Sequence, residues 1–254
     1  ADKLEIAGVL DRLGVPFTEG GWPGSNPKDS EFFSAARSEG YNTIKISAFG
    51  STHRADCLPE DDHFLKQLVD ARADISCIFG KSWLLHVDQA LRVSAARNLE
   101  MIAGSIQYLR AETGKPVFYD AEHFFDGYLQ SEAFALDMLD AAVNGGADTL
   151  VLCDTNGGSL PNYVYDTTKK IVDRYKQPIG VHCHNDSGLA AANTLMAVSA
   201  GALHVQGTIN GVGERCGNVS LATVLPNLVL KMKKETKTKL NLTDLSSLVK
   251  FTYD

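Results

Sequence analysis

Short β-rich runs alternate with amphipathic stretches along almost the whole chain, and this alternation constrains its fold most strongly. Such alternation is typical of parallel βα units, in which a helix connects each strand to the next. The clearest helical stretch runs from Val87 to Arg110, where apolar residues recur at helical spacing. The strands are predicted over residues 16–22, 43–49, 74–79, 116–122, 149–154, 179–184 and 204–209.

The number of strands and the opening of the chain together favour an α/β fold of the (β/α)8 TIM-barrel type. The chain opens at Ala1 without an initiator Met and is already in helical rhythm, with Gly14 in the position of a helix C-cap. We therefore expect a first strand, missing from this sequence, ahead of Ala1. A doubly wound open sheet is the alternative, although no Gly-x-Gly-x-x-Gly turn follows any predicted strand.

The composition changes near residue 232. A lysine-rich run from Lys231 reads as an exposed linker, and a leucine-rich segment at 240–249 follows it. We expect the barrel, without its N-terminal strand, to occupy residues 1–232. Residues 233–254 are predicted to form a linker and the start of a C-terminal helical subdomain.

Charge, hydropathy and cysteine usage exclude several classes of protein. A net charge of −7 argues against an electrostatic nucleic-acid partner. No apolar run approaches the length of a membrane span, and the opening does not resemble a signal peptide. The five cysteines are odd in number and lack Cys-x-x-Cys spacing, which is typical of reduced cytoplasmic thiols. A cytoplasmic protein acting on small molecules is therefore predicted, without nucleic-acid or membrane partners.

The strongest chemical signal is the pair His182 and His184, which runs into Asn185 and Asp186 at the end of a predicted strand. Side chains two apart on a strand point to the same side, so the two imidazoles should project together. The carboxyl ends of barrel strands form the active-site face, and neutral imidazoles there are ready divalent-metal ligands. Two separately hydrogen-bonded histidines are the alternative. A metal would also need at least one oxygen donor from elsewhere.

Asn218 ends a glycine-rich stretch that follows the last predicted strand. Its amide oxygen could point toward the neighbouring histidine pair. It could equally cap a helix over residues 219–230. The sequence leaves both roles open.

Polar residues end two other strands. Asp120 and Glu122 share a face by period two, so at least one carboxylate should enter the barrel mouth as a general base or proton shuttle. A pair of structural carboxylates is the alternative. Thr155 could hydrogen-bond a substrate carboxylate, or belong to a plain tight turn. Glu19, toward the end of the first predicted strand, could also act in the site.

These motifs together resemble the family of 2-isopropylmalate, homocitrate and citramalate synthases, over essentially all of residues 1–232. Three further segments resemble the citramalate synthase branch more closely, namely residues 20–29, 79–83 and 120–127. The matching motifs are Glu19-Gly20-Gly21-Trp22-Pro23-Gly24, Asp154-Thr155-Asn156-Gly157, His182-Cys183-His184-Asn185-Asp186 and Gly211-Val212-Gly213-Glu214-Arg215-Cys216-Gly217-Asn218.

The resemblance implies a metal-dependent acyltransferase that condenses acetyl-CoA with pyruvate to give citramalate and CoA, for isoleucine synthesis. In such enzymes a divalent ion, Mn, Mg or Zn, chelates the oxo acid. The implied metal site comprises His182 and His184, with Asn218 as a further residue at the metal. Glu122 matches a carboxylate near the reacting carbons, and Thr155 matches a substrate-contacting hydroxyl. The family also suggests a homodimer.

The chain departs from the family at its start. The family's first strand carries an Asp-Thr-Thr-Leu-Arg-Asp-Gly motif, whose Arg polarises the substrate carbonyl and whose second Asp binds the metal, and the sequence lacks it. The family's C-terminal region is absent too, so we expect this chain alone to be inactive and the intact protein to be active. The alternatives are a 2-isopropylmalate synthase, a metal-dependent acyl-CoA or 2-oxo-acid lyase on a related barrel, and a non-catalytic barrel kept for partner binding.

Overall fold

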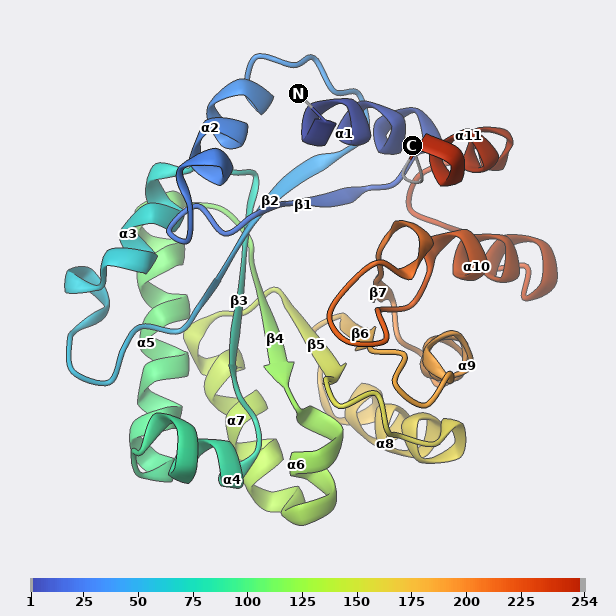
Figure 1. The fold of residues 1–254 in the computed structure, drawn as a ribbon. Coiled ribbons are helices and arrows are strands. Elements are labelled where there is room, and N and C mark those ends of the chain that lie inside the picture. Colours follow the sequence, from blue (N-terminus) through green and yellow to red (C-terminus); the bar gives the residue numbers. More distant parts are fainter. Residues whose placement is uncertain (1, 252–254) are drawn as a thin grey trace.

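The computed structural model describes residues 2–251 as a curved sheet of seven parallel strands with helices around its outside (Figure 1). Each strand pairs with the next one along the chain, from β1 to β7. A doubly wound sheet reverses its strand order at one point, so that alternative is wrong. The strands are β1 (Phe17–Gly21), β2 (Lys45–Ser51), β3 (Ile75–Lys81), β4 (Val117–Glu122), β5 (Thr149–Asp154), β6 (Ile179–Cys183) and β7 (His204–Gln206).

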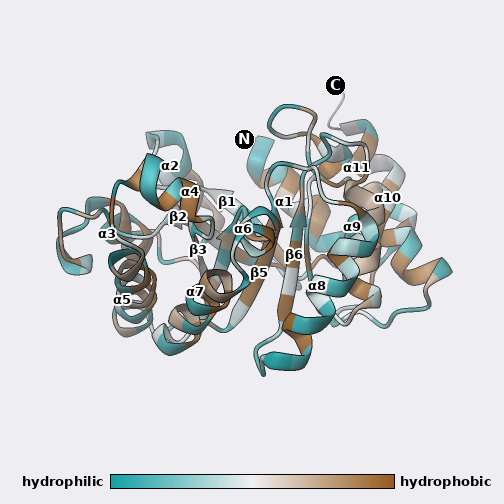
Figure 2. Ribbon diagram, turned by 90° about the horizontal axis from the view of Figure 1, so that it is seen from below, coloured by the Kyte–Doolittle hydropathy of each residue, from teal (hydrophilic) through white to brown (hydrophobic). Residues whose placement is uncertain are grey.

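Helices connect the strands and cover the outer side of the sheet. Figure 2 shows them as bands of hydrophobic and hydrophilic residues, as expected for helices that bury one side. They are α1 (Asp2–Leu13), α2 (Pro27–Ala36), α3 (His63–Asp70), α4 (Leu84–His86), α5 (Ala95–Thr113), α6 (Phe124–Gln130), α7 (Glu132–Gly145), α8 (Pro161–Arg174), α9 (Ala190–Ser199), α10 (Leu221–Pro226) and α11 (Leu245–Phe251).

All seven predicted strands are confirmed, with ends shifted by a few residues. The single helix predicted from Val87 to Arg110 is partly wrong. Its first residues form a wide turn that ends at Arg92, whose φ of 57° is left-handed. α5 then begins anew after Ser94, because the Ser94 hydroxyl caps it by accepting a hydrogen bond from the Arg97 N–H. Apolar spacing alone does not reveal such a break.

The core lies between the sheet and its helices, and a second apolar cluster fills the inside of the curve. All six residues of β5 are buried, as expected for a parallel strand covered on both faces. On the inner side the rings of Phe17 and His204 lie 5.8 Å apart, and Phe118 packs 5.4 Å from His204. Phe17 is in β1 and His204 in β7, so the two outermost strands approach each other across the interior.

The segment after residue 232 turns back onto α1. The Asn241 N–H donates to the Leu13 carbonyl at 2.8 Å, and Leu245 packs against the main core. α1 and α11 therefore lie side by side (Figure 1). The domain boundary at residue 232 stays a prediction. No helix within residues 2–251 combines the length and apolar character that a bilayer crossing needs.

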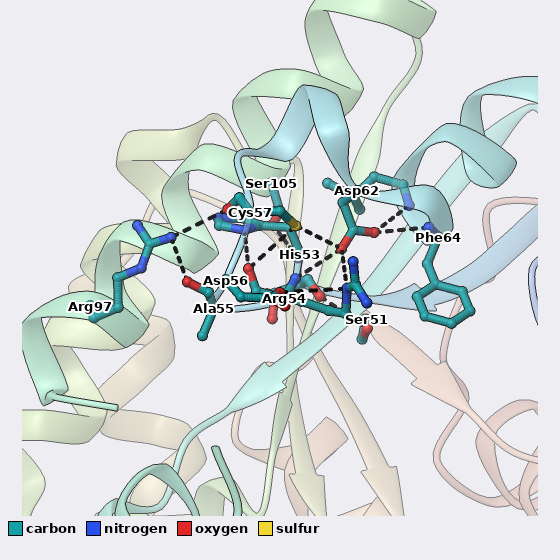
Figure 3. A network of polar contacts seen from close by, with 12 residues as sticks. Ser51, His53, Arg54, Ala55, Asp56, Cys57, Asp62, Phe64, Arg97 and Ser105 are labelled. Carbon is teal, nitrogen blue, oxygen red and sulfur yellow. Dashed lines mark hydrogen bonds and ion pairs between the residues drawn. The ribbon is translucent and has the colours of Figure 1, made fainter. Parts of the chain in front are cut away.

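The loop after β2 is held by one buried carboxylate. Asp62, only 1% exposed, accepts hydrogen bonds from the N–H groups of Arg54 at 2.9 Å, Phe64 at 2.9 Å and Leu65 at 3.0 Å. Figure 3 shows Asp62 facing the Arg54 and Phe64 backbone. The carboxylate thus caps α3 and ties the loop to it.

We expect Asp62→Ala to lower the free energy of unfolding by about 1–3 kcal/mol at neutral pH, because it leaves three N–H groups without their acceptor. Burial alone would raise the pKa of Asp62, but the hydrogen bonds from Arg54, Leu65, Cys57 and Phe64 lower it below its usual value. A lowered folded-state pKa means that the contribution is full above the ordinary Asp pKa and is lost as pH falls through the folded value.

Urea unfolding of the wild type and of Asp62→Ala, at neutral and at acidic pH, measures the difference in their free energies of unfolding. Asp56→Ala is the matched control, since Asp56 sits in the same loop and its side chain is 76% exposed. Equal unfolding free energies for Asp62→Ala and Asp56→Ala would contradict the assignment.

Candidate metal centre and active site

The structure brings His182 and His184 together at the carboxyl end of β6. Their Nε2 atoms lie 3.1 Å apart, although the ring centroids are 5.1 Å apart, so the rings converge through those two atoms. Two nitrogen ligands about 2.1 Å from one metal, at roughly 90–110° to each other, are about 3.0–3.4 Å apart. The pair therefore fits a shared divalent ion.

The other nitrogen of His182 is fixed by two residues from other strands. Its Nδ1 lies 2.8 Å from Gln206 Oε1, and Gln206 Nε2 donates to Asp120 Oδ1 at 3.0 Å. Because the carboxylate can only accept, the Gln206 amide nitrogen must face Asp120 and its oxygen must face the ring. His182 therefore carries its proton on Nδ1 and presents a free lone pair on Nε2, the arrangement of a metal ligand.

Asn218 lies directly beside this pair. It forms an isolated antiparallel bridge with His184, and its Oδ1 is buried with no hydrogen-bond partner among the described residues. Helix capping does not account for it, because α10 begins at Leu221 after Ser220. A Cβ on Gly213 would lie 2.2 Å from Asn218 Nδ2, so glycine is needed there for the amide to fit.

The donor set has a defined character. Within residues 2–251, no third His, Cys, Asp or Glu joins the histidine pair. The candidate donors are two imidazole nitrogens and the unpartnered Asn218 amide oxygen. Such a set suits a divalent ion that keeps open positions for water or substrate oxygens.

Arg215 contacts the second histidine from the loop after β7. Its Nε and Nη2 each donate to the Asp186 carboxylate at 2.8 Å, and Nη2 also lies 2.7 Å from the Thr155 carbonyl and 2.9 Å from His184 Nδ1. Burial, His182 and Arg215 together lower the pKa of His184 to about 4. His184 is therefore neutral at physiological pH. Sequence reasoning did not assign a role to Arg215.

Glu122 stands at the mouth of the barrel, paired with a lysine from the neighbouring strand β3. Lys81 and Glu122 are register partners, and Nζ lies 2.5 Å from Oε2, with the two side chains 20% and 22% exposed. The Phe79 ring lies under the same ammonium group, 5.5 Å from it. The sequence analysis did not identify Lys81 as a site residue. The available signal was its position at the end of a predicted strand, where side chains two apart point the same way.

Asp120 lies deeper than Glu122, in the barrel interior, where it is 5% exposed and accepts hydrogen bonds from Cys77 and Gln206. Burial raises its pKa. Enclosure by the barrel and the Asp120 charge raise the pKa of Glu19 to about 7, although its side chain is reached by solvent. Of the two carboxylates on β4, Asp120 supports the histidine pair through Gln206, and Glu122 reaches the mouth.

Thr155 joins the ends of β4 and β5. Its Oγ1 accepts a hydrogen bond from the His123 N–H at 2.9 Å, and His123 directly follows Glu122. The chain turns sharply there, since His123 has a left-handed φ of 58°. The hydroxyl keeps its own proton for donation, and so remains able to contact a substrate oxygen.

Comparisons with known proteins agree with this architecture. The HMGL-like family model matches residues 1–251. The (R)-citramalate synthase of Geobacter sulfurreducens is 49% identical over 253 residues, covering 100% of this chain and 48% of that protein. The (R)-citramalate synthase of Aquifex aeolicus is 47% identical, covering 98% of this chain and 47% of that protein. A probable 2-isopropylmalate synthase of Methanopyrus kandleri is 34% identical, covering 88% of this chain and 42% of that protein.

Among solved structures, an HMG-CoA lyase of Bacillus subtilis has a similar fold. Its TM-score is 0.80 at 18% sequence identity, covering 99% of this chain and 85% of that chain. This likeness supports the barrel-type fold alone. The chain spans about half the length of the curated citramalate synthases that it matches, 48% and 47% in the two cases above.

Proposed function

The chain belongs to the HMGL-like family, and on that premise we propose that the intact protein is an acyltransferase that condenses acetyl-CoA with pyruvate, giving citramalate and CoA. The observation that carries this proposal is the convergence of two imidazole Nε2 atoms, 3.1 Å apart, at the strand ends that also carry Glu122. Relatives that are named (R)-citramalate synthase share 49% and 50% of their aligned residues with this chain, and they support the choice of reaction.

His182, His184 and Asn218 would hold a divalent ion, Mn, Mg or Zn. When bound, such an ion binds the oxygens of a 2-oxo acid and stabilises negative charge that develops on the carbonyl oxygen. Gln206 and Asp120 would orient His182 for that role, as partners behind a metal ligand commonly do.

The remaining residues of the mouth would handle the substrates. Glu122 would accept a proton from the methyl group of acetyl-CoA, and the resulting enolate carbon would attack the ketone carbon of pyruvate. Hydrolysis of the thioester then releases CoA and leaves citramalate. The Thr155 hydroxyl would donate to the pyruvate carboxylate. The Phe79 ring beside Lys81 offers an apolar surface to a small substrate methyl group.

An assay of the intact protein with acetyl-CoA and pyruvate tests this proposal. We expect free-thiol release with stoichiometric citramalate, identified by chromatography, and loss of both on treatment with a chelator. Thiol release with 2-oxoisovalerate but not pyruvate would identify a 2-isopropylmalate synthase instead. Cleavage of a 3-hydroxyacyl-CoA or a 4-hydroxy-2-oxo acid, without condensation, would identify a lyase. We further propose that the protein is cytoplasmic and forms a homodimer. Light scattering, which measures molar mass in solution, tests the dimer.

A further inference from the structure

Lys81 places an ammonium group directly beside Glu122 at the mouth of the barrel. Its Nζ lies 2.5 Å from Glu122 Oε2, and the two side chains are 20% and 22% exposed. The residues are register partners on β3 and β4, so both side chains point to the same side of the sheet. A lysine ammonium has three N–H groups. Within residues 2–251 the ion pair with Glu122 uses one of them, so two are left for the oxygen of a bound substrate.

The backbone that carries this pair is fixed on both strands. The Asn98 side chain, which is fully buried, donates to the Lys81 carbonyl at 3.0 Å. The Ser82 N–H donates to the Glu122 carbonyl at 3.1 Å and continues the hydrogen bonds between β3 and β4. The ammonium also lies 5.5 Å from the centre of the Phe79 ring. Lys81 is therefore a preorganised cation beside an apolar wall, where a charge interaction is stronger than in water.

Removal of a methyl proton from acetyl-CoA moves negative charge across this place. The C–H bond breaks and its proton passes to the Glu122 carboxylate. The electron pair of that bond forms a carbon–carbon double bond, and the carbonyl π pair of the thioester moves onto its oxygen. The carboxylate thus loses a negative charge as the thioester oxygen gains one. An ammonium that contacts both groups keeps an anionic partner throughout, and the net charge of the mouth does not change.

We propose that Lys81 is a catalytic residue, which donates to the thioester oxygen of acetyl-CoA and stabilises the negative charge of the enolate. This inference rests on the proposed function, in which Glu122 is the base. Arg215, the cation on the loop after β7, is less suited to this role, because its Nε and Nη2 already bind the Asp186 carboxylate. Two other roles are open to Lys81, a structural partner of Glu122 and a binding group for the pyruvate carboxylate.

Steady-state kinetics of the intact protein test the proposal first. We expect Lys81→Met to lower kcat about 100- to 1,000-fold, the scale of one lost donor to a developing oxyanion. KM for pyruvate and the affinity for Mn²⁺ should stay near the wild-type values, since the proposed metal ligands lie at the end of β6 and on the loop after β7. Lys81→Gln, which can still donate to Glu122, guards against a variant that fails to fold. It should turn over at least about tenfold more slowly than the wild type, because a neutral donor is weaker than a charged one.

Two analogues of acetyl-CoA give a readout that does not depend on turnover. Carboxymethyl-CoA carries a carboxylate and resembles the enolate, whereas acetonyl-CoA has a similar shape and is neutral. The intact protein is titrated with each by calorimetry, with Mn²⁺ and with oxamate as an unreactive analogue of pyruvate. We expect Lys81→Met to bind carboxymethyl-CoA about 10- to 100-fold more weakly than the wild type, and acetonyl-CoA equally well. A merely structural role would change both affinities alike.

Lys170→Met is the matched control, because Lys170 also pairs with a glutamate, Glu132, and lies 5.7 Å from an aromatic ring, on an exposed surface. It should leave kcat and both affinities unchanged.

Three results would overturn the role of Lys81. Wild-type kcat in Lys81→Met would make it a structural partner of Glu122, and a higher KM for pyruvate at unchanged kcat would make it a carboxylate-binding group. An equal loss of affinity for both analogues would remove the enolate charge from its role. These results concern Lys81 alone as long as the wild type forms citramalate. If the wild type forms none, the proposed function itself is wrong, and the role of Lys81 falls with it.

Discussion

His182→Ala and His184→Ala should each weaken divalent-metal binding by at least about 100-fold in the intact protein and abolish citramalate formation. Each removes one of two imidazole nitrogens that converge at 3.1 Å. The donor that remains beside the surviving ring is an amide oxygen, which binds metals too weakly to compensate. Elemental analysis after gel filtration, together with calorimetric titration of Mn²⁺, measures the loss.

His63→Ala is the matched control, since His63 is exposed at the start of α3, away from β6. It should keep full metal content and activity. Thermal unfolding of each variant without metal separates loss of a ligand from loss of the fold. Unchanged metal content in both site variants would refute the assignment of this histidine pair.

Glu122→Gln should lower turnover by roughly two to four orders of magnitude while metal affinity stays near the wild-type value. The amide keeps the shape of the side chain and one acceptor, but it cannot take up a proton. The proposed metal ligands lie at the end of β6 and on the loop after β7, and this substitution leaves them in place. Steady-state kinetics with acetyl-CoA and pyruvate, beside Mn²⁺ titration, measure the two quantities separately.

The ion pair with Lys81 supplies the control for this prediction. Glu122→Gln leaves a partly buried ammonium group without its partner, which by itself lowers stability. The double variant Lys81→Met/Glu122→Gln removes that unpaired charge and should recover stability without recovering turnover. Normal turnover in the single variant would make Glu122 a structural carboxylate, as the alternative interpretation of the sequence held.

Local periodicity was enough to predict most of the fold and the centre of the site. Strand positions follow from short apolar runs, because parallel strands buried on both faces must be continuously apolar. The shared direction of His182 and His184 follows from the period of two in any strand. Neither inference needs to know which strand neighbours which.

Where two local patterns compete, the sequence was a weaker guide. The stretch from Val87 to Arg110 has helical spacing throughout, yet Arg92 and the Ser94 cap divide it. Asn218 suited a helix cap as well as a metal site, and the structure begins the helix three residues later, at Leu221. At Ser94 a side chain to backbone contact decided the outcome, and such a contact leaves no periodic signal.

The partners of the site residues were decided by tertiary structure alone. Lys81 reaches Glu122 through the register of β3 on β4, and Gln206 reaches His182 through the register of β7 on β6. Gln206 also reaches Asp120, because curvature of the sheet brings β7 across the interior toward β4. Arg215 meets His184 from a loop 31 residues away along the chain. The sequence determines which side chains can bind a metal or a proton. Their charge state, tautomer and depth in the barrel depend on contacts between distant strands, which only the folded chain contains.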